Sequence, residues 1–277
     1  MNIEAIILDI DGTLLNDQKE ITKRTKEVLI SAQKKGVKLI LASGRPTTGM
    51  LTYAEALDMP KYHGLLVSYN GSKVIDCHSM KELFNQAMSV EEGKAVLEHM
   101  KQFDVKVMID KEDYMYVNDV YNEKLVYRGE EINIIQYEAR GGNYKLCEIS
   151  DLAAFLDYPI NKILTAGDPA YMTANYKKMM APFENILNCM FTADFYFEFT
   201  AKGIDKAKAL DTILKPMGIP HDKMMAFGDG HNDLSMINYV GTGIAMENAV
   251  DELKKASQQV TLSNNEEGIA HILESLI

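Results

Sequence analysis

The sequence predicts an α/β fold in which a parallel-sheet core is divided along the chain by an inserted α+β domain. Two observations lead to this prediction. Strand and helix patterns alternate in about the first 80 residues and again from about residue 202, whereas the stretch between them contains mostly strand-like runs. The chain has 277 residues, which favours two domains at about 150 residues each. We expect the core to comprise 1–82 and 199–277 and the insert to comprise 83–198, to within about eight residues.

The first part of the core is expected to alternate strands with a helix. Ala5-Ile6-Ile7-Leu8 is an apolar run typical of a buried strand. Thr22 is placed to cap a helix that Gly36 ends. Asn70-Gly71 marks a tight turn after a later strand. Because the connections are short, a parallel sheet with right-handed crossovers is favoured. The expected strands are 5–8, 37–42 and 65–69.

The insert and the last part of the core show further patterns. In the insert, helices are expected over 90–103 and 170–180, strands over 105–109, 114–118, 161–166, 186–191 and 195–200, and the stretch 118–142 receives no assignment. After the insert, helices are expected over 204–214, up to 238, from 249 and from 266, and strands over 224–227, 242–246 and 260–262. The return of the strand–helix alternation indicates that both ends of the chain build one core.

The composition excludes several classes of function. The net charge is −11 and no basic run occurs, so we expect neither a nucleic-acid nor a membrane partner. No apolar run approaches the length of a membrane span, and the acids Glu4 and Asp9 make the N-terminus unlike a signal peptide. Three widely spaced cysteines without a C-x-x-C pair are typical of reduced thiols. We therefore expect a cytoplasmic protein, and the sequence gives no indication of its oligomeric state.

Two carboxylates directly follow the first strand. Asp9 and Asp11 lie at its carboxyl end, and Gly12-Thr13 breaks the strand after them. Open α/β sheets bind ligands at this edge. Asp9 could serve as a nucleophile or metal ligand and Asp11 as a proton donor and acceptor. Taken alone, these residues fit a surface Asp-Gly turn equally well.

Two further clusters lie at a strand end and a helix start. Ser43-Gly44-Arg45 follows the second strand, where a hydroxyl and backbone N–H groups suit a phosphate oxygen, although a plain turn fits these residues as well. Lys206 stands early in an expected helix, against the preference of the helix macrodipole. This position makes Lys206 a candidate partner for an anion, whereas a solvated lysine is the commoner case.

A fourth cluster, Gly228-Asp229-Gly230-His231-Asn232-Asp233, follows the strand over 224–227. Asp229, Asn232 and Asp233 have the spacing of one helix face. Two carboxylates and an amide suit a hard cation such as Mg²⁺, and an acidic N-capping turn is the alternative. His231 has no second His or Cys at ligand spacing, so we expect it to be a solvated loop residue.

Together and in this order, the four clusters resemble the signature of haloacid-dehalogenase-superfamily phosphatases. More narrowly, the chain resembles the Cof-type branch, subfamily IIB, which dephosphorylates sugar phosphates and related small metabolites. The resemblance implies a Rossmann-like core with an inserted C2-type cap, a small phosphorylated metabolite as substrate, and Mg²⁺ as cofactor. It spans both halves of the core, is weak over the insert, and departs from the family where Ala207 and Glu247 replace frequent glycines. The fragments that carry it are DIDGTLL, ASGRP, YNG, KGIDKAKAL, GDGHNDLSMI, AMENAV and SNNEEGIA.

The resemblance implies a role for each matching residue. Asp9 would attack phosphorus and form an aspartyl-phosphate, while Asp11 would protonate the leaving oxygen and then deprotonate the hydrolytic water. Mg²⁺ and Lys206 would offset the repulsion between phosphate and carboxylate. The implied Mg²⁺ ligands are the Asp9 carboxylate, the Asp11 backbone carbonyl, Asp229 and, through water, Asp233. The implied phosphate-binding positions are Ile10, Ser43, Gly44, Lys206 and Asn232.

The position of the insert separates related activities. It lies between Ser43 and Lys206, which resembles the placement of a C2 cap and argues against phosphomutase relatives, whose cap lies between the first two motifs. Such an insert offers a lid that shields the reaction from water.

The sequence also separates a phosphatase from two further classes of protein. A metabolite-binding regulator without turnover would be expected to lack Asp9, Asp11 or Asp229, and a response-regulator-like phosphoacceptor would lack Asp11 and the Gly228–Asp233 cluster. The substrate itself is not identified by the sequence. On the core side, the expected neighbours of the substrate are His63, Arg45 and Asn70.

Overall fold

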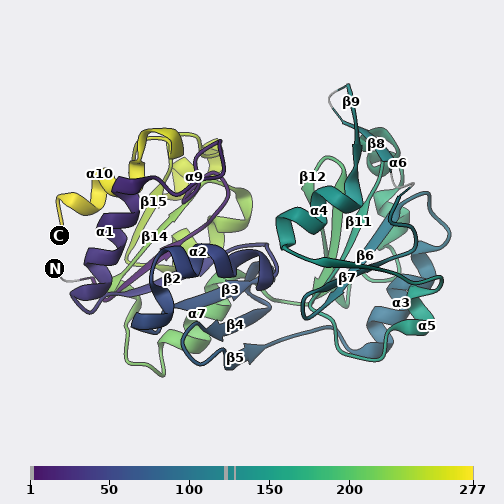
Figure 1. Cartoon of the computed structure of the whole chain (residues 1–277), viewed down its shortest axis with the longest axis horizontal. Coiled ribbons are helices and arrows are strands. Elements are labelled where there is room, and N and C mark those ends of the chain that lie inside the picture. Colours follow the sequence, from purple (N-terminus) through teal and green to yellow (C-terminus); the bar gives the residue numbers. More distant parts are fainter. Residues whose placement is uncertain (1–2, 122–123, 128, 277) are drawn as a thin grey trace. The chain divides into compact units, whose positions relative to one another are not determined.

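The computed structural model describes residues 3–121, 124–127 and 129–276. The chain divides into two compact units, a core of residues 1–85 and 205–277 and an insert of residues 86–204. The sequence had suggested divisions at 82/83 and 198/199. Figure 1 shows the first part of the chain in purple and the last part in yellow-green within the core, with the middle part in teal forming the insert.

The core is built on one sheet, in which eight strands are found among the described residues, in the order β16-β15-β14-β1-β2-β3-β4-β5. The first six of these are parallel, as expected, and β4 and β5 add antiparallel pairings at one edge. The strands are β1 (Ala5–Leu8), β2 (Lys38–Ala42), β3 (Leu65–Ser68), β4 (Lys73–Asp76), β5 (Glu82–Asn85), β14 (Met224–Gly228), β15 (Thr242–Ala245) and β16 (Gln259–Val260). The central parallel strands thus bring both ends of the chain into one sheet.

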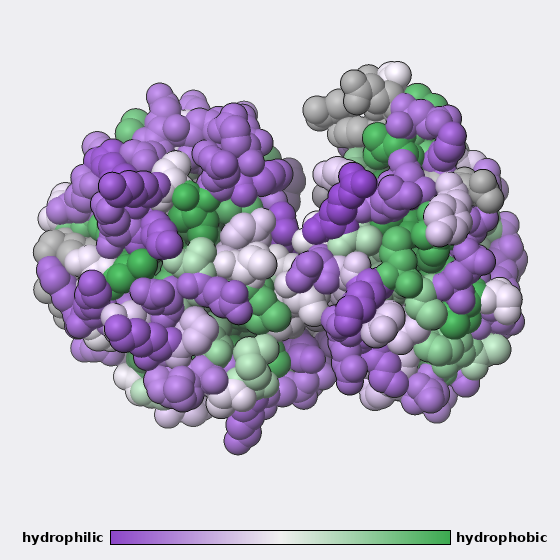
Figure 2. All heavy atoms as spheres, viewed as in Figure 1, coloured by the Kyte–Doolittle hydropathy of each residue, from purple (hydrophilic) through white to green (hydrophobic). Residues whose placement is uncertain are grey.

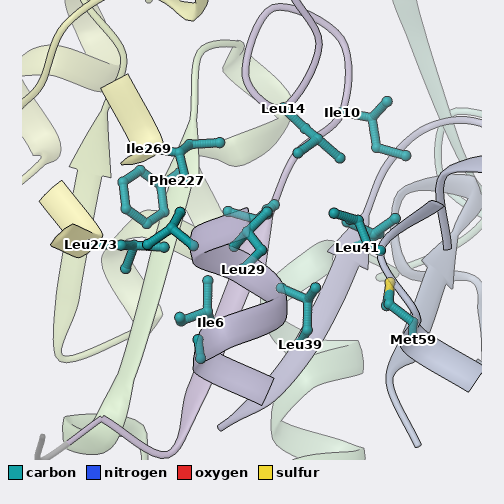
Figure 3. Close-up of a cluster of buried hydrophobic side chains, with 14 of the residues drawn as sticks. Ile6, Ile10, Leu14, Leu29, Leu39, Leu41, Met59, Phe227, Ile269 and Leu273 are labelled. Atoms are coloured by element: carbon teal, nitrogen blue, oxygen red, sulfur yellow. The ribbon is translucent and has the colours of Figure 1, made fainter. Parts of the chain in front are cut away.

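Apolar side chains cover both faces of the core sheet. Along β1, Ile6 and Leu8 face one apolar cluster while Ala5 and Ile7 face the other, as the alternation of a strand requires. Figure 3 shows part of the first cluster, including Leu29 of α1. The helices of the first face are α1 (Lys23–Lys34), α2 (Leu51–Ala56) and α10 (Gly268–Glu274), and those of the second are α7 (Lys206–Leu214), α8 (Leu234–Tyr239) and α9 (Asp251–Ala256). The core is therefore a three-layer α/β structure, which confirms the predicted class.

The insert has its own mixed sheet, ordered β10-β7-β6-β11-β13-β12, and a separate β8-β9 hairpin. Its strands are β6 (Lys106–Lys111), β7 (Tyr114–Val117), β8 (Lys124–Tyr127), β9 (Glu130–Asn133), β10 (Lys145–Glu148), β11 (Lys162–Ala166), β12 (Leu187–Ala193) and β13 (Tyr196–Ala201). Helices α3 (Val90–Met100), α5 (Leu152–Phe155) and α6 (Pro169–Met180) pack in one apolar cluster, and α4 (Ile134–Gly142) packs in another. The α+β character of the insert is confirmed.

The structure corrects several expected element boundaries. Helix α7 begins at Lys206 rather than Ile204, because the Asp205 side chain caps it by accepting the Lys208 N–H at 2.9 Å. The last helix begins at Gly268 rather than 266, because Glu267 has a φ of 61° and cannot continue a right-handed helix. Strands β4 and β5 and helix α2 were not predicted. The unassigned stretch contains the hairpin and α4 where the structure describes it.

Short 3₁₀ turns link several of these elements. Two of them lie at the carboxyl ends of core strands, η3 (Tyr69–Gly71) and η5 (His231–Asp233). Asp229, Asn232 and Asp233 therefore lie in a loop and a 3₁₀ turn, and α8 begins after them at Leu234. The helix-like spacing noted in the sequence thus falls on this loop and 3₁₀ turn, and the helix follows them as expected. The other 3₁₀ turns are η1 (Thr48–Met50), η2 (Met59–Tyr62), η4 (His221–Lys223) and η6 (Asn264–Glu266).

The surface is largely polar. Figure 2 shows hydrophilic residues over most of the visible face of each unit, with apolar residues in smaller patches between them. Within the described part of the chain, we find no helix with the length and apolar character that crossing a membrane requires.

Candidate active site

The carboxyl end of β1 carries the two carboxylates singled out in the sequence. Asp9 is held at this edge because its backbone N–H donates to the Phe227 carbonyl of β14 at 3.1 Å, and its side chain is buried. Gly12 turns the chain away with a φ of +81°. A Cβ at Gly12 would lie 2.3 Å from Asp229 Oδ2. Only glycine satisfies both this backbone conformation and this close approach.

Lys206 lies at the centre of the buried charges. Its Nζ is 2.6 Å from Asp9 Oδ1 and 2.6 Å from Asp233 Oδ1, and its side chain is fully buried. Burial alone would lower the pKa of Lys206, but the carboxylates of Asp233 and Asp9 raise it above its usual value. The lysine is therefore positively charged, and it joins the first segment of the core to the last.

Three carboxylates converge around this lysine. Asp9, Asp229 and Asp233 each offer an oxygen atom within 4.8 Å of the others, and this is the one such group of His, Cys, Asp or Glu in the part of the chain that the structure describes. Burial raises the pKa of Asp9 well above its usual value, and the Asp233 charge adds to this effect. Burial and Asp233 likewise raise the pKa of Asp229 to about 6. One ammonium does not balance three carboxylates, so the cluster fits a divalent cation, whose charge would relieve the repulsion.

The turn around Asp229 fixes the geometry of the cluster. Asp233 Oδ2 accepts the backbone N–H groups of Asp229 and Gly230, each at 3.0 Å. The hydroxyl of Thr13 donates to Asp229 Oδ1 at 2.9 Å. Thr13 was not among the predicted site residues, although its place two residues after Asp11 was a usable signal. The result is a site whose carboxylates are oriented before any ligand arrives.

Ser43 and Asn232 lie beside the same edge and are connected through Asn70. Ser43 is buried, and its carbonyl accepts the Asn70 N–H at 2.9 Å. Asn70 adopts a φ of 56° in η3, and its Oδ1 accepts a hydrogen bond from Asn232 Nδ2 at 3.0 Å. A Cβ at Gly44 would lie 3.1 Å from Asn70 Nδ2. The ends of β2, β3 and β14 thus place a hydroxyl and amides near one another, with Asn70 as their link.

Asp11 is held differently from Asp9. Arg45 donates two hydrogen bonds to the Asp11 carboxylate, from Nε to Oδ2 at 2.6 Å and from Nη2 to Oδ1 at 2.8 Å. Lys19 Nζ lies 2.9 Å from Asp11 Oδ1. Partial burial alone would raise the pKa of Asp11, but Arg45 and then Lys19 lower it to about 2. In this arrangement Asp11 is an ionised carboxylate, which suits a proton acceptor. To donate a proton, it must leave Arg45.

Three other expected residues behave as follows. The side chain of Ile10 packs in the apolar core, so its backbone is the part available to a ligand. His231 is a solvated loop residue, as expected, with 70% of its side chain exposed and Nδ1 at 3.1 Å from Glu252. The expectation for His63 is wrong, because it precedes β3 and its carbonyl accepts Lys38 Nζ from the start of β2 at 2.8 Å. His63 therefore lies at the opposite end of the strands from Asp9.

Comparisons with known proteins find relatives over nearly the whole chain. Residues 6–273 match the family described as haloacid dehalogenase-like hydrolase. A 5-amino-6-(5-phospho-D-ribitylamino)uracil phosphatase of Bacillus subtilis is 28% identical over 272 residues, which cover 98% of this chain and 94% of the relative. A crystal structure of a haloacid dehalogenase-like hydrolase from Bacteroides thetaiotaomicron has a TM-score of 0.91 and 30% identity, and covers 99% of this chain and 100% of that chain. A subclass IIB sugar phosphatase shares the fold, with a TM-score of 0.78 at 22% identity, 99% of this chain and 98% of that one being covered.

Proposed function

This chain belongs to the haloacid dehalogenase superfamily as a Cof-type phosphatase of small phosphorylated metabolites, and from this premise we propose that it forms an aspartyl-phosphate on Asp9, depends on Mg²⁺ and prefers sugar phosphates. One observation carries the proposal. The buried Asp9 carboxylate contacts Lys206 at 2.6 Å, and its oxygen converges with those of Asp229 and Asp233. A nucleophile, a fixed cation and a candidate metal site therefore share one strand end.

The first step is phosphoryl transfer to Asp9. A carboxylate oxygen of Asp9 forms a bond to phosphorus as the bond from phosphorus to the substrate oxygen breaks. Once Asp11 has left Arg45 and taken up a proton from water, it gives that proton to the departing oxygen, which leaves as an alcohol. The negative charges of Asp9 and the phosphate repel each other. The Lys206 ammonium, which contacts Asp9, reduces this repulsion. The transition state needs positioning and charge stabilisation more than covalent assistance.

The second step is hydrolysis of the aspartyl-phosphate. Asp11, now a carboxylate, takes a proton from water as that water attacks phosphorus, and the bond to Asp9 breaks to release inorganic phosphate. The ion pair of Asp11 with Arg45 favours the ionised form that this step requires. The two steps therefore need Asp11 in two arrangements, one against Arg45 and one at the leaving oxygen.

The metal site is formed by residues of both ends of the core. We assign Mg²⁺ to the carboxylates of Asp9 and Asp229, the Asp11 backbone carbonyl and, through water, Asp233. When bound, the cation neutralises charge on the phosphate and on the nucleophile. Three converging carboxylates against one lysine, with Asp9 and Asp233 buried and Asp229 half-buried, support this assignment, because the surplus negative charge is otherwise uncompensated.

We assign the binding of the phosphate oxygens to polar groups at the neighbouring strand ends. These are the Ser43 hydroxyl, the backbone of Gly44 and Ile10, the Lys206 ammonium and the Asn232 amide. The link from Asn70 to Asn232 supports their grouping, because it joins the ends of β3 and β14 at 3.0 Å. Asn70 is added as a positioning residue for Asn232.

The names of two relatives support a narrower substrate class. One relative is named for a substrate with a phosphorylated ribityl chain, and a structure of the same fold is a sugar phosphatase. Both names describe a phosphate on a polyhydroxylated carbon chain. We therefore assign this protein a phosphorylated sugar or sugar alcohol as its preferred substrate.

The proposal is tested by phosphate release from p-nitrophenyl phosphate and a panel of sugar and sugar-alcohol phosphates, with Mg²⁺ or EDTA. We expect Mg²⁺-dependent release in the wild type and a loss of more than about a thousandfold in Asp9→Asn, because the nucleophile is removed. Asp58→Asn is the matched control, since Asp58 is exposed and its φ of 56° suits asparagine. Near-wild-type turnover by Asp9→Asn would contradict the mechanism. A preference for phosphates without hydroxylated chains would contradict the substrate class.

A further inference from the structure

Two asparagines from the last part of the chain bind the backbone of the segment that follows Asp11. Asn248 Nδ2 donates to the Gly12 carbonyl at 2.8 Å. Asn264 Nδ2 donates to the Leu15 carbonyl at 2.9 Å. They come from the segments after β15 and β16, which the sequence fragments AMENAV and SNNEEGIA occupy. The proposed chemistry gives neither residue a role.

The two asparagines also hold each other. The backbone N–H of Asn264 donates to Asn248 Oδ1 at 3.0 Å, which turns the Asn248 amide group toward Gly12. Asn264 itself is buried, with 7% of its surface exposed. A buried side-chain amide is costly to leave unpaired, so the bond to Leu15 is strongly favoured. The pair thus forms a relay from η6 to the segment after Asp11.

This relay reaches Asp11 through the backbone, because it binds the carbonyl of Gly12. Gly12 is the next residue after Asp11, and its closest approach is to the Asp229 carboxylate. The Gly12 carbonyl belongs to the peptide that joins Gly12 to Thr13, so a bond that fixes this carbonyl also holds Gly12, which is covalently joined to Asp11. In the described contacts, the Asp11 side chain is held by the long and partly exposed side chains of Arg45 and Lys19. The backbone, rather than these side chains, is the fixed reference for Asp11.

We propose that Asn248 and Asn264 are positioning residues that set the Asp11 carboxyl for proton transfer to the leaving oxygen. The inference rests on the proposed function, because it concerns the acid step at the same site. The asparagines act through the Gly12 and Leu15 carbonyls and contact neither substrate nor metal ligand side chains in the described contacts.

The dependence on the leaving group separates this role from a merely structural one. Nitrophenolate leaves near neutral pH without a proton, whereas a sugar alkoxide must receive one. A misplaced Asp11 should therefore slow transfer from a sugar phosphate more than transfer from p-nitrophenyl phosphate. A general loss of folded protein would reduce both rates by the same factor. The value of kcat/KM is the correct measure, because it reports steps up to the first irreversible transfer and excludes later hydrolysis.

The experiment compares wild type, Asn248→Asp, Asn248→Ala and Asn265→Ala on p-nitrophenyl phosphate and on the best sugar phosphate of the panel. Asn248→Asp keeps the acceptor for Asn264 and removes the donor to Gly12, whereas Asn248→Ala removes both without adding charge. Asn265→Ala is the matched control, because Asn265 donates to the exposed Asp17 carboxylate and accepts the Asp17 backbone N–H, each at 3.0 Å, and binds neither the Gly12 nor the Leu15 carbonyl in the described contacts. Circular dichroism and thermal melting verify the fold of each variant.

We expect both Asn248 variants to lose about tenfold more kcat/KM on the sugar phosphate than on the aryl phosphate, and Asn265→Ala to keep the wild-type ratio. Equal losses on the two substrates, or no loss, would overturn the positioning role while leaving the proposed function intact. A folded wild type that releases phosphate from neither substrate would instead overturn the proposed function, and this inference with it. Because Asn248 is exposed, its variants are expected to fold even where changes at the buried Asn264 are not.

Discussion

Each unit of this protein contains a buried lysine paired with carboxylate, and the two pairs differ in what surrounds them. In the core, Lys206 contacts Asp9 and Asp233 at a strand edge built from loops. In the insert, Lys162 of β11 contacts Glu198 of the neighbouring β13 at 3.1 Å, within the regular ladder of the sheet. Burial alone would lower the pKa of Lys162, but Glu198 and the more distant Glu138 and Asp110 raise it above its usual value.

The difference lies in the convergence of the carboxylate oxygens rather than in burial. Around Lys206, three carboxylates approach one another closely enough to hold a metal ion, whereas those around Lys162 form no such group among the described residues. The Glu138 carboxylate is instead bound by the Tyr196 hydroxyl at 3.0 Å. Both lysines are buried and charged, so burial does not distinguish a catalytic site from a structural ion pair. The distinguishing feature is a group of carboxylate oxygens that converge without enough positive charge to balance them.

Replacing the two lysines by methionine tests this contrast, and the larger effect is expected in the core. Lys206→Met should lower kcat/KM by about a thousandfold, because a preorganised cation beside the reacting phosphate is lost. Its metal-free form should also be less stable at neutral pH and regain stability with Mg²⁺, since three carboxylates then lack a counter-charge. Steady-state kinetics and thermal melting with and without Mg²⁺ measure both effects. Unchanged kinetics would show that Lys206 is a structural partner.

The matching change in the insert should act on stability instead. Lys162→Met leaves Glu198 buried without its cation, and we expect the free energy of unfolding to fall by about 3 kcal/mol. Mg²⁺ should not restore this loss, because no group of converging carboxylates surrounds the position in the described residues. Urea denaturation with and without Mg²⁺ is the measurement. Full rescue by Mg²⁺ would mean that the two buried pairs are alike.

The pH dependence of metal binding gives a smaller effect of defined sign. The pKa of Asp229 is raised to about 6 in the folded, metal-free protein. A carboxyl with a raised pKa keeps its proton in the folded state over the range from about 4 to about 6 where the unfolded state has lost it. Asp229 therefore reduces the stability of the metal-free protein as pH rises through this range. Mg²⁺ must displace the proton, so its affinity should fall up to about tenfold per pH unit below 6. Calorimetric titration from pH 5 to 7.5, with Asp229→Asn as control, would show a flat profile if the assignment is wrong.

The smallest effect is expected at His231, which lies among the site residues in the sequence but outside them in space. Its side chain points to Glu252 and is 70% exposed. His231→Ala should change stability by less than about 0.5 kcal/mol and leave turnover within about twofold. A large loss of turnover would mean that the site extends beyond the convergent carboxylates.

The sequence predicts the parts of the site that depend on strand ends. Asp9, Ser43 and Asp229 follow apolar runs that are recognisable as strands, and the carboxyl ends of parallel strands share one edge. The contacts between those ends were not predictable, because they depend on which strands are neighbours. The bonds of Arg45 to Asp11 and of Asn70 to Asn232 join different strand ends, so no local pattern encodes them.

Strand direction explains the wrong expectation for His63. The residue lies close in the chain to Asn70, but it precedes β3, whereas Asn70 follows it. The two residues therefore stand at opposite ends of one strand. In the insert, short strands such as β8 and β9 carry too little apolar periodicity to be assigned, and their pairing as a hairpin depends on tertiary packing.

The divided core has a consequence for folding during translation. β1 pairs on one side with β14. β14 begins at Met224, which is 215 positions after Asp9 at the end of β1. At ribosomal rates of about 5–20 residues per second, on the order of ten seconds or more passes between the emergence of these two strands. During that time one edge of β1 waits for its neighbour while the insert, whose sheet uses only its own residues, can complete its folding. Lys206, Asp229 and Asp233 emerge only after the insert, so a chain at that stage carries Asp9, the proposed nucleophile, without its charged partners, and we expect no phosphate release before β14 has emerged.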